Sequence, residues 1–171
     1  MIVAVDGTSA SGKGTLAEKL AQHFNLEPLD TGLLYRAVAL SMITAGDNLE
    51  DEKKATNHAA SLDYTSMDSP RLRNSDIGVA SSKIAAMKAV RLTLLDFQQN
   101  FAKNPPNGRS GTILDGRDIA TVVCPEADSK IFVTANIEIR AKRRWKQLIQ
   151  SDEAAIYTHV LEELRERDTR D

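Results

Sequence analysis

The segment that most constrains this chain is MIVAVDGTSASGKGT, at its N-terminus. An apolar run at residues 1–5 is followed at once by Gly7, Gly12 and Gly14, which surround Lys13. Continuous apolar runs of this length are typical of strands that are covered on both faces, as in parallel sheets. The next residues place leucine and phenylalanine at a spacing of four, which favours an amphipathic helix. The predicted order is therefore strand, glycine loop, helix.

A strand that turns sharply into a helix directs several backbone N–H groups to one point, where the helix dipole also favours negative charge. Glycine is needed there because a Cβ would obstruct a backbone wrapped around phosphate oxygens. Lys13 adds a mobile positive charge for the terminal phosphates. The alternative is a chance glycine turn between strand and helix. The residues expected to hold ATP are Gly7, Thr8, Ser9, Ala10, Ser11, Gly12, Lys13, Gly14 and Thr15.

The loop departs in one place from the general pattern G-x-x-x-x-G-K-[ST]. Gly14 occupies the hydroxyl position, and Thr15 follows one residue later. We therefore expect Mg²⁺ to bind mainly through phosphates and water, with Thr15 and Asp115 as the candidate protein ligands. The histidines lack the spacing of metal ligands, and no metal site is assigned to them.

The rest of the chain alternates between short apolar runs and helical periodicities, which predicts an α/β domain with a largely parallel sheet. Residues 47–75 are polar and have no firm period, so we expect a mobile insert or small appendage there. The predicted strands lie at 25–30, 112–116 and 130–135, and the predicted helices at 15–24, 33–46, 77–101, 137–149 and 157–170.

Composition excludes several classes of protein. The 171 residues suit one main domain, and the net charge of −2 gives no general attraction to nucleic acid or anionic membranes. Cys124 is the single cysteine, which excludes an intramolecular disulfide and a multi-cysteine zinc site. No basic segment precedes the apolar start, and no stretch approaches 18 apolar residues. We expect a cytoplasmic monomer with no membrane or nucleic-acid partner.

Six motifs occur in order along nearly the whole chain: GTSASGKGT, LDTGLLYR, SSKIAAMKAVR, LDGRDIATVVCP, RAKRRW and RERDTRD. Together they resemble the bacterial cytidylate kinase family of P-loop nucleoside monophosphate kinases. The resemblance implies a P-loop NTPase fold with a helical lid and a small NMP-binding appendage. It also implies transfer of the γ-phosphoryl group of ATP to CMP or dCMP. We expect one kinase domain over 1–171, with a core at 1–46 and 76–135, an insert at about 47–75, and lid and C-terminal helices at 136–171.

The acceptor site is expected where short strands end. In LDTGLLYR, Thr31, Tyr35 and Arg36 lie at a turn and the first helical turn after a strand, which is an anion-facing geometry. The resemblance further places Ser82, Arg91 and Asp118 at the cytosine ring, Tyr35, Arg36 and Arg117 around the CMP phosphate, and Arg167 and Asp171 near the sugar and phosphate. Gly116, next to Arg117, is also expected to bind the substrate. A carboxylate such as Asp118 can accept a hydrogen bond from the exocyclic amine of cytosine, which predicts CMP over UMP.

Each of these assignments has a plainer alternative. Ser82 and Tyr35 could be core or surface polar groups, and Arg36 and Arg91 could be solvated helix charges. Arg140, Arg143 and Arg144 share one helical face. The resemblance implies that these three arginines close over the ATP phosphates as catalytic groups with Lys13 and Arg117, and the alternative is a solvated basic face.

Two other functions stay open at this point. One is a kinase on the same scaffold that acts on UMP, dTMP or shikimate, and the other is a non-catalytic nucleotide-binding switch, although the guanine-specificity element N-K-x-D is missing. The chain departs from the resembled family at Ala10, where a glycine is common. The family pattern also continues past the position of Asp171 with another arginine and a final strand, so we expect one sheet edge and part of the CMP site to be absent, whether the chain is truncated or naturally short.

Overall fold

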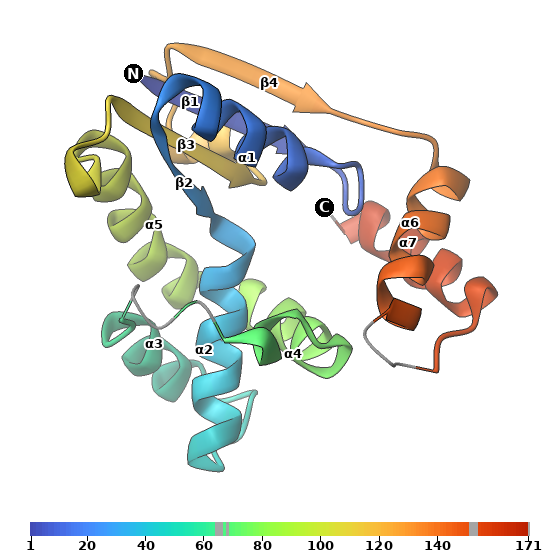
Figure 1. The fold of residues 1–171 in the computed structure, drawn as a ribbon. Coiled ribbons are helices and arrows are strands. Elements are labelled where there is room, and N and C mark those ends of the chain that lie inside the picture. The colour runs from blue at the N-terminus through green and yellow to red at the C-terminus, as the bar shows by residue number, and fades with distance from the viewer. Residues whose placement is uncertain (64–66, 68, 151–153, 171) are drawn as a thin grey trace.

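The computed structural model describes residues 1–63, 67, 69–150 and 154–170. Its centre is a sheet of four parallel strands in the order β2–β3–β1–β4 (Figure 1). This confirms the predicted α/β class with a parallel sheet. The strands are β1 (Ile2–Gly7), β2 (Leu26–Asp30), β3 (Gly111–Gly116) and β4 (Ser129–Val133).

The register brings polar strand ends together. Asp30 at the end of β2 lies opposite Asp115 on β3, and Asp6 on β1 lies opposite Gly116. Because the strands run parallel, their carboxyl ends meet at one edge of the sheet, which is where α/β folds place ligands. The glycine loop starts from that same edge, directly after β1.

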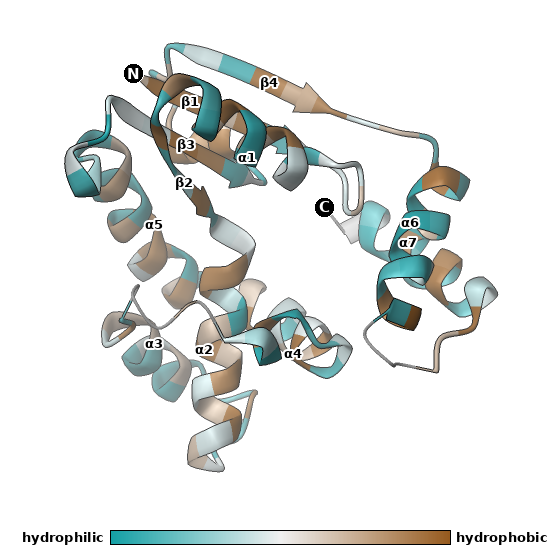
Figure 2. Ribbon diagram, viewed as in Figure 1, coloured by the Kyte–Doolittle hydropathy of each residue, from teal (hydrophilic) through white to brown (hydrophobic). Residues whose placement is uncertain are grey.

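The two faces of the sheet are covered by different helices. Val3 and Val5 of β1 pack with Ala17 and Ala21 of α1 on one face, while Ala4 joins the larger cluster on the other. This alternation explains the continuous apolar run at residues 1–5, because both faces of β1 are buried. Figure 2 accordingly shows β1 and β3 mostly hydrophobic. The helices are α1 (Lys13–Phe24) on the first face and α2 (Thr31–Ala45) and α5 (Lys88–Lys103) on the second, while α4 (Ser75–Ala85) packs against α2.

The last two helices form a separate unit beside the loop (Figure 1). These are α6 (Ile137–Gln150) and α7 (Tyr157–Arg170), which we call the α6–α7 pair. Their small apolar core contains Ala141, Leu148, Val160 and Leu164. The Trp145 indole N–H donates to the Ala155 carbonyl at 3.0 Å and holds the segment before α7 against α6. Both helices were predicted from the sequence.

The prediction of one long helix over 77–101 is wrong. The chain leaves the helical conformation at Met87 (φ −79°, ψ 120°), so α4 ends at Ala85 and α5 begins at Lys88. Ile84 and Val90 are both fully buried on either side of the break. The apolar spacing therefore continues across it without a glycine or proline to indicate a boundary.

The polar stretch 47–75 contains regular structure where no firm period was found. It holds α3 (Glu52–Ala60) and a short 3₁₀ helix, η2 (Pro70–Arg73), while residues 64–66 and 68 lie outside the described residues. α3 packs against α2 and α5. Its buried side chains are only Ala55 and Ala59, four residues apart. Two small side chains make an apolar stripe too narrow to stand out among polar neighbours, and Figure 2 shows α3 as mostly hydrophilic.

Two further short elements lie near the sheet. They are η3 (Pro106–Gly108) before β3 and a π-helical turn, η4 (Ile119–Val123), after it. The π turn begins directly after Asp118, which has a left-handed backbone (φ 57°). It therefore places the LDGRD segment at the functional edge of the sheet.

Candidate active site

The glycine loop has the backbone that the sequence predicted. A Cβ on Gly7 (φ 155°) would lie 2.1 Å from the Val133 carbonyl oxygen, so only glycine fits between β1 and β4. Gly12 (φ 99°) occupies a conformation that L side chains rarely adopt. Ala10 (φ 58°) is also left-handed, in the position where the resembled family commonly has glycine.

The loop presents unsatisfied polar groups. No described side chain caps the N-terminus of α1, which begins at Lys13. The Thr8 and Ser11 hydroxyl oxygens are buried, and neither has a hydrogen-bond partner among the described residues. Buried polar groups normally have partners. A bound phosphate would supply one, which favours an anion site over a chance turn.

Lys13 faces the carboxylates at the strand ends. Burial lowers its pKa, and Asp115 opposes that shift. Burial also raises the pKa of Asp115 to about 7, reinforced by the charge of Asp30 and opposed by Lys13. The cluster is therefore a poorly solvated set of charges, in which a bound cation and anion would both be strongly stabilised.

The α6–α7 pair is fastened to the loop by two arginines. Arg143 Nη1 donates to the Ser11 carbonyl at 2.9 Å, and Arg140 Nη1 donates to the Ser9 carbonyl at 3.3 Å. Arg140 is 5% exposed and makes a two-pronged ion pair with Asp168 of α7. The alternative of a solvated basic face is thus wrong for Arg140, whose guanidinium joins α6, α7 and the loop.

A cavity of about 380 Å³ lies next to the loop on the α5 side. Arg91 of α5 and Asp118 meet there, with Arg91 Nη2 3.2 Å from Asp118 Oδ2. α5 contributes both polar and apolar side chains to the lining of the cavity, including Arg91, Gln98 and Leu95. Of the predicted acceptor residues the cavity brings together Thr31, Tyr35, Arg91, Gly116, Arg117, Asp118 and Arg167.

Two predicted acceptor residues use their hydroxyl groups within the protein. Thr31 is buried and donates to the Asp115 carbonyl at 3.0 Å, so it joins α2 to the end of β3. Ser82 does not line the cavity, and its hydroxyl donates to the Gly78 carbonyl at 3.1 Å within α4. The predicted contact of Ser82 with the cytosine ring stays a prediction. Asp171 lies outside the described residues, and its predicted role is equally untested.

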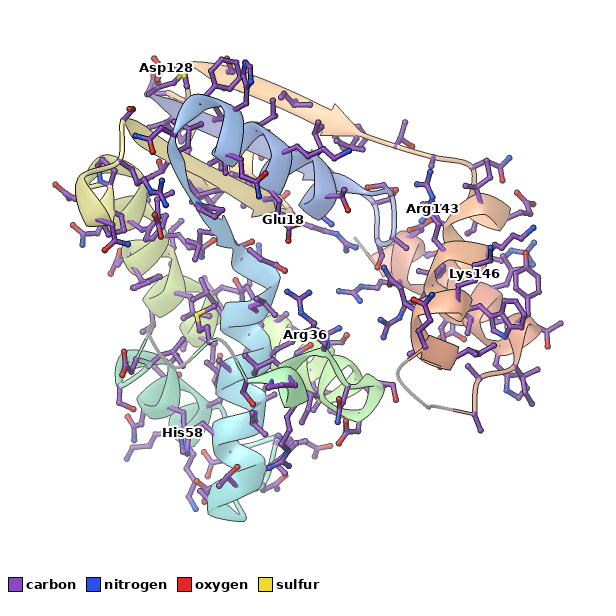
Figure 3. The ribbon with its side chains drawn as sticks, viewed as in Figure 1. Glu18, Arg36, His58, Asp128, Arg143 and Lys146 are labelled. Carbon is purple, nitrogen blue, oxygen red and sulfur yellow. The ribbon has the colours of Figure 1, made fainter. Side chains whose placement is uncertain are left out.

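Basic side chains surround a second cavity of about 460 Å³, between α2 and the α6–α7 pair. Figure 3 shows Arg36 on α2 and Arg143 on α6; Arg36 lines this cavity, whereas Arg143 donates to the glycine loop. Burial, and then the charges of Arg144 and Arg167, lower the pKa of Arg36 to about 10. Burial and Arg167 likewise lower the pKa of Arg117 to about 10. Such a set of cations is destabilised by mutual repulsion, and a polyanion between them would remove that cost.

Besides Asp30, three residues of the site were missed by sequence reasoning. Asp6 accepts hydrogen bonds from the backbone N–H groups of Ile119 and Ala120, each at 2.8 Å, and so holds the turn that follows Asp118. Its position between a buried strand and Gly7 was the available signal. Arg73 lines the basic cavity from η2, and nothing in its polar segment indicated this role.

The third missed residue is Gln98, which lines the acceptor cavity although it is only 3% exposed. Its amide donates to the Leu94 carbonyl at 2.9 Å and also interacts with the Tyr35 hydroxyl group, whose pKa is raised by burial. Gln98 continues the apolar face of α5 one turn after Leu94. A buried amide in that register cannot be distinguished from a surface residue by spacing alone.

The site can accommodate a divalent cation only in a restricted way. The described residues contain no cluster of three or more histidine, cysteine or acidic side chains that could hold a metal by itself. Asp30 and Asp115 nevertheless offer oxygen ligands beside Lys13, and Mg²⁺ prefers one or two carboxylates together with phosphates and water. The donor set fits that mode, and Thr15, exposed on the first turn of α1, lines the same cavity as Asp30 and Asp115 and stays a predicted ligand.

Comparison with known proteins agrees with this geometry. Residues 3–171 match the family model described as cytidylate kinase. A cytidylate kinase of Methylocella silvestris is 51% identical over all of this chain and 77% of its own length. Cytidylate kinases of Bartonella henselae and Azorhizobium caulinodans are 47% and 48% identical over 99% and 100% of this chain and over 77% and 81% of their own lengths.

Likeness to solved structures is more distant. The crystal structure of an uncharacterized protein from Eubacterium ventriosum matches 99% of this chain and 72% of its own length, with a TM-score of 0.49 and 15% identity. That likeness carries no argument about function. Within the described ranges, no helix combines the length and apolar character needed to cross a membrane.

Proposed function

The chain belongs to the cytidylate kinase family, and we propose that it phosphorylates CMP, and also dCMP, by direct transfer of the γ-phosphoryl group of ATP. ATP occupies the glycine loop, and the pyrimidine nucleotide occupies the cavity beside α5. The observation that carries this proposal is the Arg91–Asp118 pair, which faces a phosphate-binding loop across one cavity that also contains Lys13. The alternatives of another acceptor on the same scaffold and of a non-catalytic switch are not favoured.

The proposed chemistry needs no general base. The acceptor oxygen belongs to a phosphate that is already ionised near neutral pH, so the protein has to position two anions and stabilise the charge of a loose transition state. Lys13 reaches the terminal phosphates from the loop. Arg117, Arg143 and Arg144 add positive charge from both sides, and Arg36 and Arg167 hold the acceptor phosphate. Arg140 acts through its contacts with Ser9 and Asp168, which keep the α6–α7 pair on the loop.

We attribute base selection to Arg91 and Asp118, the ion pair that lines the acceptor cavity. The Asp118 carboxylate accepts from the exocyclic amine of cytosine, and Arg91 donates to the ring acceptors while neutralising Asp118. Uracil would direct a carbonyl oxygen at the same carboxylate. A site built to hydrogen-bond one substrate group can reject an analogue that lacks it by about 10⁴-fold.

Mg²⁺ is part of the proposed site. Asp115, with Asp30 beside it, would hold the ion together with phosphates and water, and the ion would supply charge neutralisation between the two nucleotides. The high pKa of the Asp115 carboxyl supports this assignment, since a carboxylate that lacks solvation gains from a cation. We further propose that the chain acts as one kinase domain, as a monomer and in the cytoplasm.

A panel of acceptors tests the function. The purified protein with ATP and Mg²⁺ is given CMP, dCMP, UMP, dTMP or shikimate, and ADP release is measured. We expect rapid release with CMP and dCMP and, by the discrimination above, rates lower by about 10² or more with the other acceptors. Tight ATP binding with no acceptor-dependent turnover would contradict the proposal and indicate a switch.

A further inference from the structure

A carboxylate from the polar segment reaches the start of the helix that carries Arg91. Glu52 Oε1 accepts a hydrogen bond from the Ala89 backbone N–H at 2.9 Å, although the two residues lie 37 positions apart. Glu52 is the first residue of α3, and Ala89 is the second residue of α5. The contact therefore joins the two helices at their N-terminal ends.

The first turn of α5 lacks a cap of its own. Its N-cap residue, Met87, provides no side-chain hydrogen bond, and the first turn contains no acidic residue. The N–H groups of a first helical turn have no partner within the helix, and the helix dipole favours negative charge at that end. Glu52 meets both requirements from outside the helix.

The capped turn also carries a specificity residue. Arg91 follows Ala89 by two positions, and its backbone N–H closes the first turn on the Met87 carbonyl at 3.1 Å. Val90 and Leu94 are buried on the core face of α5, so the remaining freedom of its first turn lies at the end that Glu52 holds. The direction of this turn sets how far the Arg91 guanidinium reaches across the cavity toward Asp118.

α3 is itself firmly held, so that Glu52 can act as a fixed anchor. Asp51 caps the N-terminus of α3. Near its other end, His58 links Ser41 of α2 at 2.8 Å to Asp47 at 3.0 Å. These contacts fix α3 at both ends, and its alanine stripe packs against the core.

We propose that Glu52 is a positioning residue for the acceptor: from α3 it holds the first turn of α5, and thereby the Arg91 guanidinium, opposite Asp118. This inference rests on the proposed function of the cavity as the CMP site. It gives the polar segment a part in substrate selection. Loss of the contact acts on CMP binding and on base discrimination, because Lys13 and the loop are held by β1 and α1 instead.

Three variants test the proposal. Glu52→Ala should raise KM for CMP about tenfold and lower the CMP-to-UMP ratio of kcat/KM, with kcat and KM for ATP within about twofold of wild type. Glu52→Gln keeps an oxygen that can accept from Ala89, and it should restore KM for CMP to within about threefold of wild type. Glu50→Ala removes the same charge at an exposed position two residues earlier, where the carboxylate faces Lys83 of α4, so KM for CMP should change less than about twofold.

A further pair of variants separates positioning from general loosening. In an Arg91→Ala background, adding Glu52→Ala should change KM for CMP less than about twofold, because residues acting through one another are not additive. An additive loss would overturn the proposal, as would an unchanged KM in Glu52→Ala or an equal loss in Glu50→Ala. If Glu52→Ala fails to fold, a Glu52→Gln enzyme whose KM for CMP rises about tenfold would overturn it. Failure of the wild-type protein to phosphorylate CMP would instead contradict the proposed function.

Discussion

At the residue scale, Lys13 is the group on which the donor half of the site depends. It is the first residue of α1, directly after the strained Gly12. Burial lowers its pKa and Asp115 opposes that shift, so its charge is maintained by neighbouring anions and not by water. A cation held in that way interacts strongly with a transferring phosphoryl group.

Replacing Lys13 with methionine keeps the length of the side chain and removes its charge. We expect kcat to fall by about 10²–10³, the usual cost of losing one preorganised electrostatic contact to the transition state, with a smaller change in KM for CMP. Lys19→Met is the matched control, since Lys19 is exposed on the same helix and should be silent. Steady-state assays with CMP measure both variants, and near-normal turnover in Lys13→Met would refute the role.

Asp118 is the corresponding residue on the acceptor half. Alanine at this position removes the acceptor for the cytosine amine and leaves Arg91 without its ion-pair partner. We expect the ratio of kcat/KM for CMP to that for UMP to fall by about 10² or more. A ratio that stays at the wild-type value would contradict the proposed contact between Asp118 and the cytosine base. Kinetics with both nucleotides at fixed ATP supply the measurement.

Individual site residues were predictable where a motif or a spacing marked them. The glycines and Lys13 form a recognisable pattern, and Asp118 follows a strand-terminal LDG. Asp6 and Gln98 were missed because their functions depend on what the fold brings to them: two N–H groups of η4 for Asp6, and Tyr35 for Gln98. No spacing rule contains such long-range partners.

At the scale of elements, the predictions succeeded where one periodicity ran between clear boundaries. β1, α1 and α2 are such cases, since α2 ends at Gly46 in the left-handed conformation. The break between α4 and α5 and the whole of α3 were not found, because both depend on packing. In α3 the decisive features are Ala55 and Ala59 against the core and Glu52 against α5, and none of these is visible in local hydropathy.

The α6–α7 pair provides a prediction at this scale. Asp168→Asn removes the charge opposite the buried Arg140, and breaking a buried pair on one side costs about 3 kcal/mol or more. We expect α7 to exchange its amide hydrogens faster and KM for ATP to rise about tenfold, since Arg140 also holds the Ser9 carbonyl. KM for CMP should change less than KM for ATP.

The control for this experiment is Glu163→Gln, an equal charge change at an exposed position of the same helix. Its exchange rates and KM for ATP should match those of the wild type. If the amide hydrogens of α7 exchange at the same rate in Asp168→Asn and in the wild type, the ion pair does not hold the two helices together.

At the scale of the whole molecule, the net charge of −2 conceals a strong local separation of charge. Cations from α1, α2, η2, α6 and α7 converge near Asp30 and the buried Asp115 at the end of the sheet. Composition and net charge therefore could not indicate a site of this kind. Repulsion among these cations and the burial of charge lower the free energy of unfolding of the nucleotide-free protein, as is common for binding sites.

This burial of charge makes stability depend on pH through Asp115. Burial raises the pKa of its carboxyl from 3.8 to about 7. The folded-state pKa lies above the unfolded value, so burying Asp115 costs nothing in ionisation free energy below pH 3.8, where the carboxyl is protonated in both states. As the pH rises from 3.8 through about 7, the unfolded chain gains more from ionising this group, and the free energy of unfolding falls. At about 1.4 kcal/mol per pKa unit, the loss is at most about 4 kcal/mol.

Asp115→Asn removes this titration while keeping the shape of the side chain. In the nucleotide-free protein, the stability advantage of the variant over wild type should grow from pH 4 to pH 7 and level off above about pH 7. Urea unfolding monitored by circular dichroism at several pH values gives the free energy of unfolding of both proteins. The contributions of the other titrating groups are the same in both and cancel in the difference. An advantage that is independent of pH, or a variant less stable than wild type at pH 8, would contradict the assignment of the raised pKa to Asp115. With ATP and Mg²⁺ bound the advantage should shrink, because the ligands then provide the countercharge that the empty site lacks.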